Sequence, residues 1–262
     1  KVLSYVSTFN VHFSILLNYP NYINKKDQTI NNTGDLVIPE GTQVKWIFGT
    51  AETDELLFIA KDSTMSLAQS AEDEFMVKNR FYFSQQYGIS TSNEYLQFED
   101  TVYYNLNVIK DTRPSIEVDA KDDSLNPKMR YFKGFVKDDY GFSRLVFHAQ
   151  FISANDSTGQ PFSEEIPINK SIPQTDFYHA WNSNKFQLKA GDRVEYYFEI
   201  WDNDGVNGSK SARTSKQVFK APTKDELVEK NKQTSEEVKK ELAENIKLTK
   251  EIKKDLEELK EK

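Results

Sequence analysis

Acidic and amide side chains alternate along one short segment of the sequence, Asp202-Asn203-Asp204-Gly205-Val206-Asn207-Gly208. Oxygen ligands at alternate positions around a turn glycine are typical of loops that bind calcium. The segment has no trailing glutamate that could bind with both carboxylate oxygens, so the EF-hand motif does not fit. A second acidic pair, Asp138 and Asp139, stands in another short loop just before Tyr140 and Gly141.

Strand order predicts that these two loops meet. The hydrophobic patterns at 131–136 and 142–152 fit strands B and C of an immunoglobulin-like sandwich, and those at 194–201 and 211–219 fit strands F and G. The B–C and F–G loops of such a sandwich share one end of the domain. The two acidic segments are therefore expected at the same end.

Two interpretations of this acidic end stay open. In the first, Asp138, Asp139, Asp202 and Asp204 converge with Asp111 of the preceding linker, bind calcium and fix the angle between two domains. In the second, each Asp or Asn side chain accepts hydrogen bonds from nearby backbone N–H groups and so holds its own tight turn. Calcium is the only cofactor that the sequence suggests.

The remaining residue types offer no catalytic arrangement. His12, His148 and His179 have no metal-ligand spacing, and strand alternation accounts for each of them in a strand. The sequence has no Gly-x-Ser-x-Gly elbow and no phosphate-binding glycine loop. It also has no cysteine, which excludes disulfides, thiolate metal sites and cysteine nucleophiles. We therefore expect a protein that is not an enzyme.

Composition narrows the class of partner. The formal net charge is −7, and no basic patch of the kind that binds nucleic acid is present. Aromatic residues make up 13% of the chain, which favours strands over helical bundles. No apolar run reaches the length of a membrane span. The chain begins at Lys1 without a signal peptide, so we expect a fragment of a longer protein whose membrane anchor lies outside it.

Short strands and turns predict a mainly β fold of two tandem immunoglobulin-like β-sandwiches followed by a long C-terminal α-helix. The expected boundaries are 1–110 and 111–221 for the sandwiches and 222–262 for the helix. In the first sandwich, alternation places Trp46 inward, on the same face as its neighbours two residues away.

The helix begins with a capping box, in which Thr223 is the N-cap and Glu226 is its partner. A heptad-like seam follows, but polar residues such as Asn231 and Asn245 interrupt it. The seam could pair with a second copy or with a later helix of the same protein. Alternatively, the segment is a solvated spacer helix.

Exposed aromatic side chains could bind carbohydrate. The candidates are Tyr103, Tyr104, Tyr178, Tyr196 and Tyr197. Adjacent tyrosines in a strand point to opposite faces, so one member of each pair is expected in the core. The sequence around Tyr196 also resembles a tyrosine corner, in which the hydroxyl bonds back to the backbone.

A series of motifs occurs in a characteristic order along the chain. They are Tyr19-Pro20-Asn21-Tyr22, Asn32-Thr33-Gly34-Asp35-Leu36, Pro39-Glu40-Gly41-Thr42 with Val44-Lys45-Trp46, Lys137-Asp138-Asp139-Tyr140-Gly141-Phe142, and Trp201-Asp202-Asn203-Asp204-Gly205-Val206-Asn207-Gly208. Together they resemble a family of large, membrane-anchored Gram-negative proteins that carry tandem Ig-like repeats and charged helical regions. That family has no assigned function. The resemblance implies a periplasmic location.

These observations favour a non-enzymatic structural or interaction module, a spacer or scaffold of a bacterial cell-envelope protein. Its expected partners are other envelope proteins. The alternative function is a carbohydrate- or peptidoglycan-binding module.

Overall fold

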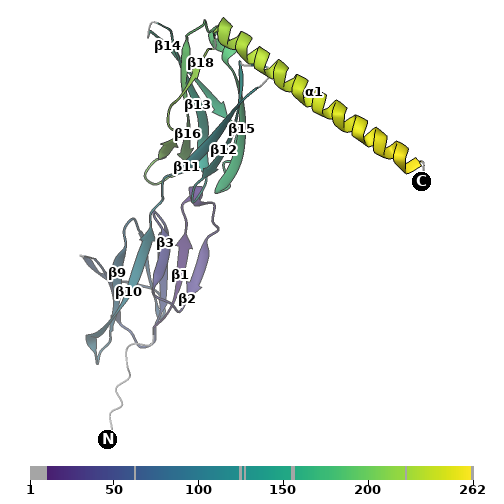
Figure 1. Cartoon of the computed structure of the whole chain (residues 1–262). Coiled ribbons are helices and arrows are strands. Elements are labelled where there is room, and N and C mark those ends of the chain that lie inside the picture. Colours follow the sequence, from purple (N-terminus) through teal and green to yellow (C-terminus); the bar gives the residue numbers. More distant parts are fainter. Residues whose placement is uncertain are drawn as a thin grey trace.

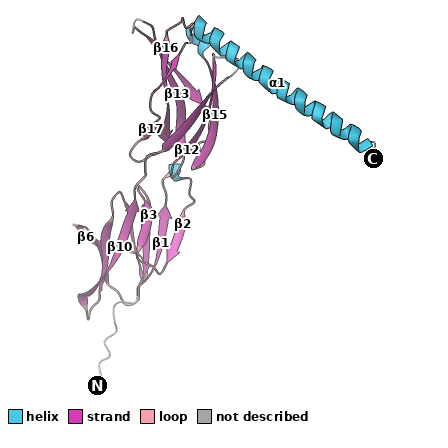
Figure 2. Cartoon of the chain, in the orientation of Figure 1, coloured by secondary structure: helices cyan, strands magenta, loops and turns pink. Residues whose placement is uncertain are grey.

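The computed structural model describes residues 11–260, apart from 62, 124–125, 127, 155–156 and 222. The chain is mainly β, with one long C-terminal helix, as the sequence predicts (Figure 2). We call residues 11–109 the N-terminal β unit and residues 115–220 the C-terminal β unit. The two units lie end to end, and the helix extends away from the outer end of the C-terminal unit (Figure 1).

The N-terminal β unit packs two sheets around one core. Its strands are β1 (His12–Asn18), β2 (Gln28–Asn31), β3 (Leu36–Pro39), β4 (Gln43–Gly49), β5 (Glu55–Ala60), β6 (Ser63–Leu67), β7 (Gln69–Ala71), β8 (Glu74–Arg80), β9 (Gln85–Ser92) and β10 (Gln97–Ile109), with a short 3-10 helix at Asn21–Ile23. The strand orders are β2-β1-β4-β8-β7 and β3-β10-β9-β5-β6. Alternate residues of β4 point inward, and Trp46 is fully buried, as predicted.

The C-terminal β unit has the same construction. Its strands are β11 (Ser115–Asp122), β12 (Met129–Lys137), β13 (Phe142–Ile152), β14 (Thr158–Ile166), β15 (Gln174–Asn182), β16 (Arg193–Asp202), β17 (Ser211–Arg213) and β18 (Gln217–Lys220), with a 3-10 helix at Ser183–Phe186. The strand orders are β11-β12-β15 and β14-β13-β16-β17, and β18 also pairs with β16. Phe132, Phe147 and Phe198 meet in the core between the sheets.

This strand order positions the two acidic segments. The BC loop, residues 138–141, joins β12 to β13, and the FG loop, residues 203–210, joins β16 to β17. Because β13 and β16 pair antiparallel, the start of β13 lies beside the end of β16, with Phe142 opposite Asp202. Both loops therefore leave the sheet at the end that faces the N-terminal unit.

Helix α1 (Lys224–Lys260) begins with the predicted capping box. The Thr223 N–H donates to the Glu226 carboxylate at 2.7 Å, and the Glu226 N–H donates to the Thr223 hydroxyl at 3.2 Å. Apolar side chains such as Val238 and Leu242 are exposed along it. None of the described helices is both long enough and apolar enough to cross a membrane.

Some local features differ from the sequence-based expectations. The sequence patterns do not indicate the polar edge strands β2, β6 and β7. The Tyr196 hydroxyl accepts a hydrogen bond from the Arg130 guanidinium at 2.7 Å instead of forming the tyrosine corner. A buried hydroxyl takes whichever partner its surroundings supply.

Candidate functional site at the junction of the two β units

The FG loop contacts the N-terminal β unit directly. The Asn203 side-chain amide donates to the Tyr22 carbonyl at 3.0 Å, and the Asn207 amide donates to the Glu40 carboxylate at 3.0 Å. Val206 packs so closely on Gly41 that a Cβ there would lie 2.6 Å from a Val206 methyl carbon. The loop therefore joins the two units through both hydrogen bonds and packing.

Two more contacts strengthen this junction. The rings of Tyr22 and Tyr140 meet edge to face, with centroids 5.7 Å apart. Glu40, which is buried, accepts a second hydrogen bond at 2.6 Å from the ammonium of Lys110, which directly follows the N-terminal unit. The Glu40 carboxylate thus joins the residue that follows its own unit to the FG loop of the other unit.

The FG loop holds its shape through its own aspartates. One carboxylate oxygen of Asp204 accepts the N–H groups of Val206 and Asn207 at 2.7 and 3.0 Å. One oxygen of Asp202 accepts the N–H groups of Asp204 and Lys210 at 3.2 and 2.8 Å. The aspartates thus hold the tight turn of this loop, which is the arrangement that the second interpretation describes.

The BC loop is built in the same way. One carboxylate oxygen of Asp138 accepts the N–H groups of Tyr140 and Gly141, each at 2.9 Å. Asp139 accepts the N–H of Thr112 in the linker between the units, at 3.2 Å. The BC loop therefore holds the linker as well as its own turn.

One ammonium group lies among the carboxylates. The side-chain nitrogen of Lys210 lies 2.6 Å from an oxygen of Asp111, 2.6 Å from an oxygen of Asp204 and 3.2 Å from an oxygen of Asp202. The three carboxylate side chains are at most 1% exposed, whereas the Lys210 side chain is 22% exposed. The single ammonium of Lys210 therefore pairs with three buried carboxylates.

Burial and charge move the pKa values at this cluster in different directions. Burial alone would lower the pKa of Lys210, but hydrogen bonds to Asp111, Asp204 and Asp202 outweigh it and raise that pKa. Burial would raise the pKa of Asp204, but Lys210 and the N–H donors of its turn lower it. Asp204 therefore stays ionised.

Asp111 behaves differently because no backbone N–H in the described part of the chain donates to its carboxylate. Burial raises its pKa to about 6, against the lowering effect of Lys210, and the nearby carboxylates of Asp139 and Asp204 add to the rise. One of its oxygens is buried and has no hydrogen-bond partner among the described residues. Burial likewise raises the pKa of Asp138. Asp111 is thus poised to take up a proton in mildly acidic solution.

The structure gives each predicted metal residue a partner of another kind. Asp202 and Asp204 face Lys210, whereas Asp138 and Asp139 bind backbone N–H groups. Among the residues described, no group of three or more histidines, aspartates or glutamates is arranged to hold a metal ion. Calcium binding stays a prediction, and a calcium ion would compete with the ammonium of Lys210 for the same oxygens.

Sequence reasoning missed Lys210 and Glu40. Lys210 stands two residues after Gly208 at the end of the acidic segment, and that position is the only signal in the sequence. Glu40 is buried in a turn, and its partner Asn207 comes from the other unit, 167 residues away in the sequence. Neither role follows from local sequence patterns.

The other candidate residues have structural surroundings. His179 stacks on Phe132 and lies against Phe147. His148 stacks on Tyr197 with ring centroids 4.7 Å apart. These contacts give both imidazole rings a packing role in the C-terminal β unit.

The tyrosine candidates separate as alternation predicts. Tyr196 is buried and Tyr104 packs against the N-terminal core, so one member of each adjacent pair does point inward. Tyr103 and Tyr178 are exposed, by 58% and 70% of their surface.

Comparison of the sequence with protein families and with curated proteins finds no match. In structure, the chain is similar to a chain of a 1.5-MDa bacterial ice-binding adhesin, at 10% identity and a TM-score of 0.40, over 70% of this chain and 57% of that one. It is also similar to fibronectin(III)-like modules of Clostridium thermocellum CbhA, at 10% identity and a TM-score of 0.23, over 69% and 88% of the two chains. A DUF4785 family protein from Legionella pneumophila matches at 14% identity and a TM-score of 0.26, over 72% and 55%. The structural neighbours of this mainly β chain thus include an adhesin, fibronectin-like modules and a bacterial protein of a family of unknown function.

Proposed function

We propose that the chain is a non-enzymatic structural and interaction module that holds two immunoglobulin-like domains, 1–110 and 111–221, at a fixed angle. The helix from 222 onward would extend the module toward a protein partner. On the resemblance of its motifs, we place the module in the periplasm, as part of a membrane-anchored bacterial envelope protein. Detection of the chain in the periplasmic fraction of the source bacterium tests that location.

The observation that supports this function is the FG loop network. Domains that share a small interface are expected to move relative to each other. Here the side chains of Asn203 and Asn207 donate hydrogen bonds to the N-terminal unit, and Lys210 donates one to Asp111 of the linker. The FG loop therefore restrains both the N-terminal unit and the linker. A rigid junction is what a spacer needs, because bending would shorten its reach.

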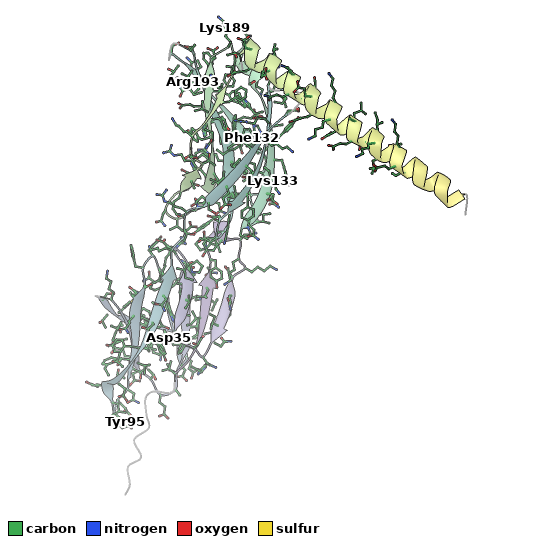
Figure 3. All side chains as sticks on the ribbon, in the orientation of Figure 1. Asp35, Tyr95, Phe132, Lys133, Lys189 and Arg193 are labelled. Carbon is green, nitrogen blue, oxygen red and sulfur yellow. The ribbon has the colours of Figure 1, made fainter. Side chains whose placement is uncertain are left out.

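Distances between spin labels test the rigidity. The chain has no cysteine, so Tyr95→Cys and Lys189→Cys give two unique attachment points at opposite ends of the β units (Figure 3). We expect pulsed electron–electron double resonance to give a single narrow distribution of distances between the two labels. The double variant Asn203→Ala/Asn207→Ala should broaden it, whereas Lys216→Met, on the surface of the C-terminal unit, should not. A broad distribution in the otherwise unchanged chain would contradict the proposal.

Glycan binding is a second candidate function, and a specific feature favours it. Three exposed aromatic side chains, Tyr82, Phe83 and Tyr103, line one groove on the N-terminal β unit. Apolar side chains that are exposed together in one place often mark a binding site, whereas single exposed ones do not. Titration with saccharides tests this function.

A further inference from the structure

The groove on the N-terminal β unit has the size of a ligand site. Its volume is about 570 Å³, and strands β5, β8, β9 and β10 contribute to its lining. Sites for small ligands have volumes of roughly 300–1,000 Å³. The groove therefore has room for one or two sugar rings, and it is separate from the FG loop network.

Tyr103, one of the lining residues of the groove, lies over a glycine of the neighbouring strand. Tyr103 on β10 stands opposite Gly88 on β9, which in turn stands opposite Ile59 on β5. A Cβ at Gly88 would lie 2.8 Å from a carbon of the Tyr103 ring. The missing side chain thus lets the ring lie over the neighbouring strand, and the ring is still 58% exposed. This arrangement presents an aromatic face to solvent.

The other two aromatic side chains stand on a restrained loop. The ammonium of Lys110 donates to the Tyr82 carbonyl at 2.7 Å and lies 4.3 Å from the centroid of the Phe83 ring. The Ser84 hydroxyl accepts the N–H of Val108 at 2.9 Å. Because the loop is already held, a ligand would lose little affinity to ordering it.

The charge of the lining is opposite to that of the protein. Lys61 and Arg80 line the groove, and none of its described lining residues is an aspartate or a glutamate, although the chain carries a net charge of −7. Within the described part of the chain, neither cation forms a salt bridge. An arginine that has no acidic partner can bind a carboxylate with two parallel hydrogen bonds.

We propose that this groove binds an acidic oligosaccharide built of uronic acid units. The apolar C–H face of one sugar ring would pack on Tyr103, and a sugar carboxylate would pair with Arg80 and Lys61. Asn79 and Gln85, which also line the groove, offer amide groups that can both donate to and accept from sugar hydroxyls. The proposal rests on the second candidate function, and it does not depend on a rigid junction.

Titration with trigalacturonate, followed by nuclear magnetic resonance of the amide groups, tests the site. The matched ligand is the methyl ester of the same trisaccharide, which keeps the rings and removes the charge. We expect saturable shifts at the groove residues with trigalacturonate. The dissociation constant should be at least about tenfold higher for the ester than for trigalacturonate. The dissociation constant for trigalacturonate should rise with salt concentration.

Variants separate stacking from charge. Tyr103→Ala and Arg80→Gln should each raise the dissociation constant for trigalacturonate about tenfold or more, and Tyr103→Phe should restore binding. Tyr178→Ala, which removes an exposed tyrosine from the C-terminal unit, is the control and should leave the dissociation constant unchanged. Unchanged thermal melting of each variant would show that the fold persists.

Three outcomes would overturn the proposal. They are an absence of shifts at millimolar trigalacturonate, equal affinity for the methyl ester, and equal affinity for succinate, which would mean a simple anion site. None of them affects the spin-label distances, so a failure here is distinguishable from a flexible junction.

Discussion

The side-chain nitrogen of Lys210 lies 2.6 Å from a carboxylate oxygen of Asp111, although 99 residues separate the two in the chain. Asp111 belongs to the linker between the β units, and Lys210 ends the FG loop. The same ammonium also contacts Asp202 and Asp204. The ion pair between Lys210 and Asp111 therefore fixes the linker to the FG loop, in addition to the covalent connection of the linker to both units.

Replacing Lys210 should destabilise the protein strongly. Lys210→Met would leave Asp111, Asp202 and Asp204 buried without their cation, and breaking such a buried pair costs about 3 kcal/mol or more. The loss should be larger at pH 8 than at pH 5, because the remaining carboxylates can take up protons in acid. Urea unfolding at both pH values measures the effect.

Lys216→Met is the matched control for this substitution. Its ammonium lies 3.5 Å from Glu195, and its side chain is 62% exposed. Surface pairs of this kind contribute little. Equal losses for the two lysine variants would contradict the central role of Lys210.

Calcium should not stabilise the unaltered protein, because the ammonium of Lys210 already lies against the oxygens of Asp202 and Asp204 that the ion would need. We expect thermal melts with calcium, magnesium or a chelator to coincide at matched ionic strength. In Lys210→Met the same oxygens become available, and calcium should then raise the melting temperature by mass action. A calcium-specific rise in the unaltered protein, abolished by Asp204→Asn, would instead establish the metal site that the sequence suggested.

The contrast between predicted and missed features has a physical basis. Strand β13 has the predicted bounds, Phe142–Ile152, and the Thr223 capping box forms as expected, because both follow from patterns within a few residues. Strand β6 is exposed at nearly every position, so it carries no hydrophobic alternation. The pairing of Lys210 with Asp111 depends on two segments that only the complete fold brings together. The acidic loops could be placed by strand order, but their cation could not.

Trp46→Ala should be among the most damaging substitutions in the N-terminal β unit. The Trp46 ring is fully buried and lies 5.1 Å from the rings of Phe58 and Tyr87 and 5.6 Å from that of Phe81, between centroids. Truncating a buried tryptophan costs roughly 3–5 kcal/mol. Denaturant unfolding measures the loss.

Trp201→Ala provides the comparison for Trp46. Trp201 is only half-buried, and the Arg144 guanidinium lies 4.2 Å from the centroid of its ring. We expect a clearly smaller loss of stability for this variant. Similar melting temperatures for the Trp46 variant and the unaltered protein would mean that the strand alternation in β4 is wrong.

His179 and His148 should make the protein less stable in acid. Burial lowers the pKa of His179 against the raising effect of Glu164, and burial likewise lowers the pKa of His148 against Glu199. Both histidines take up a proton more readily in the unfolded chain, where the pKa is about 6.5. Their contribution to stability is therefore complete above that pH and is lost as the pH falls below it.

Comparison with His179→Gln and His148→Gln isolates this effect from that of Asp111. The raised pKa of Asp111 acts in the opposite direction, because its proton stabilises the folded state as the pH falls through about 6. That contribution is the same in the variants and cancels in the difference. The free energy of unfolding of each variant, minus that of the unaltered protein, should therefore increase as the pH falls from 8 to 5. A difference that stays constant over this range would show that the histidines bind protons equally in both states.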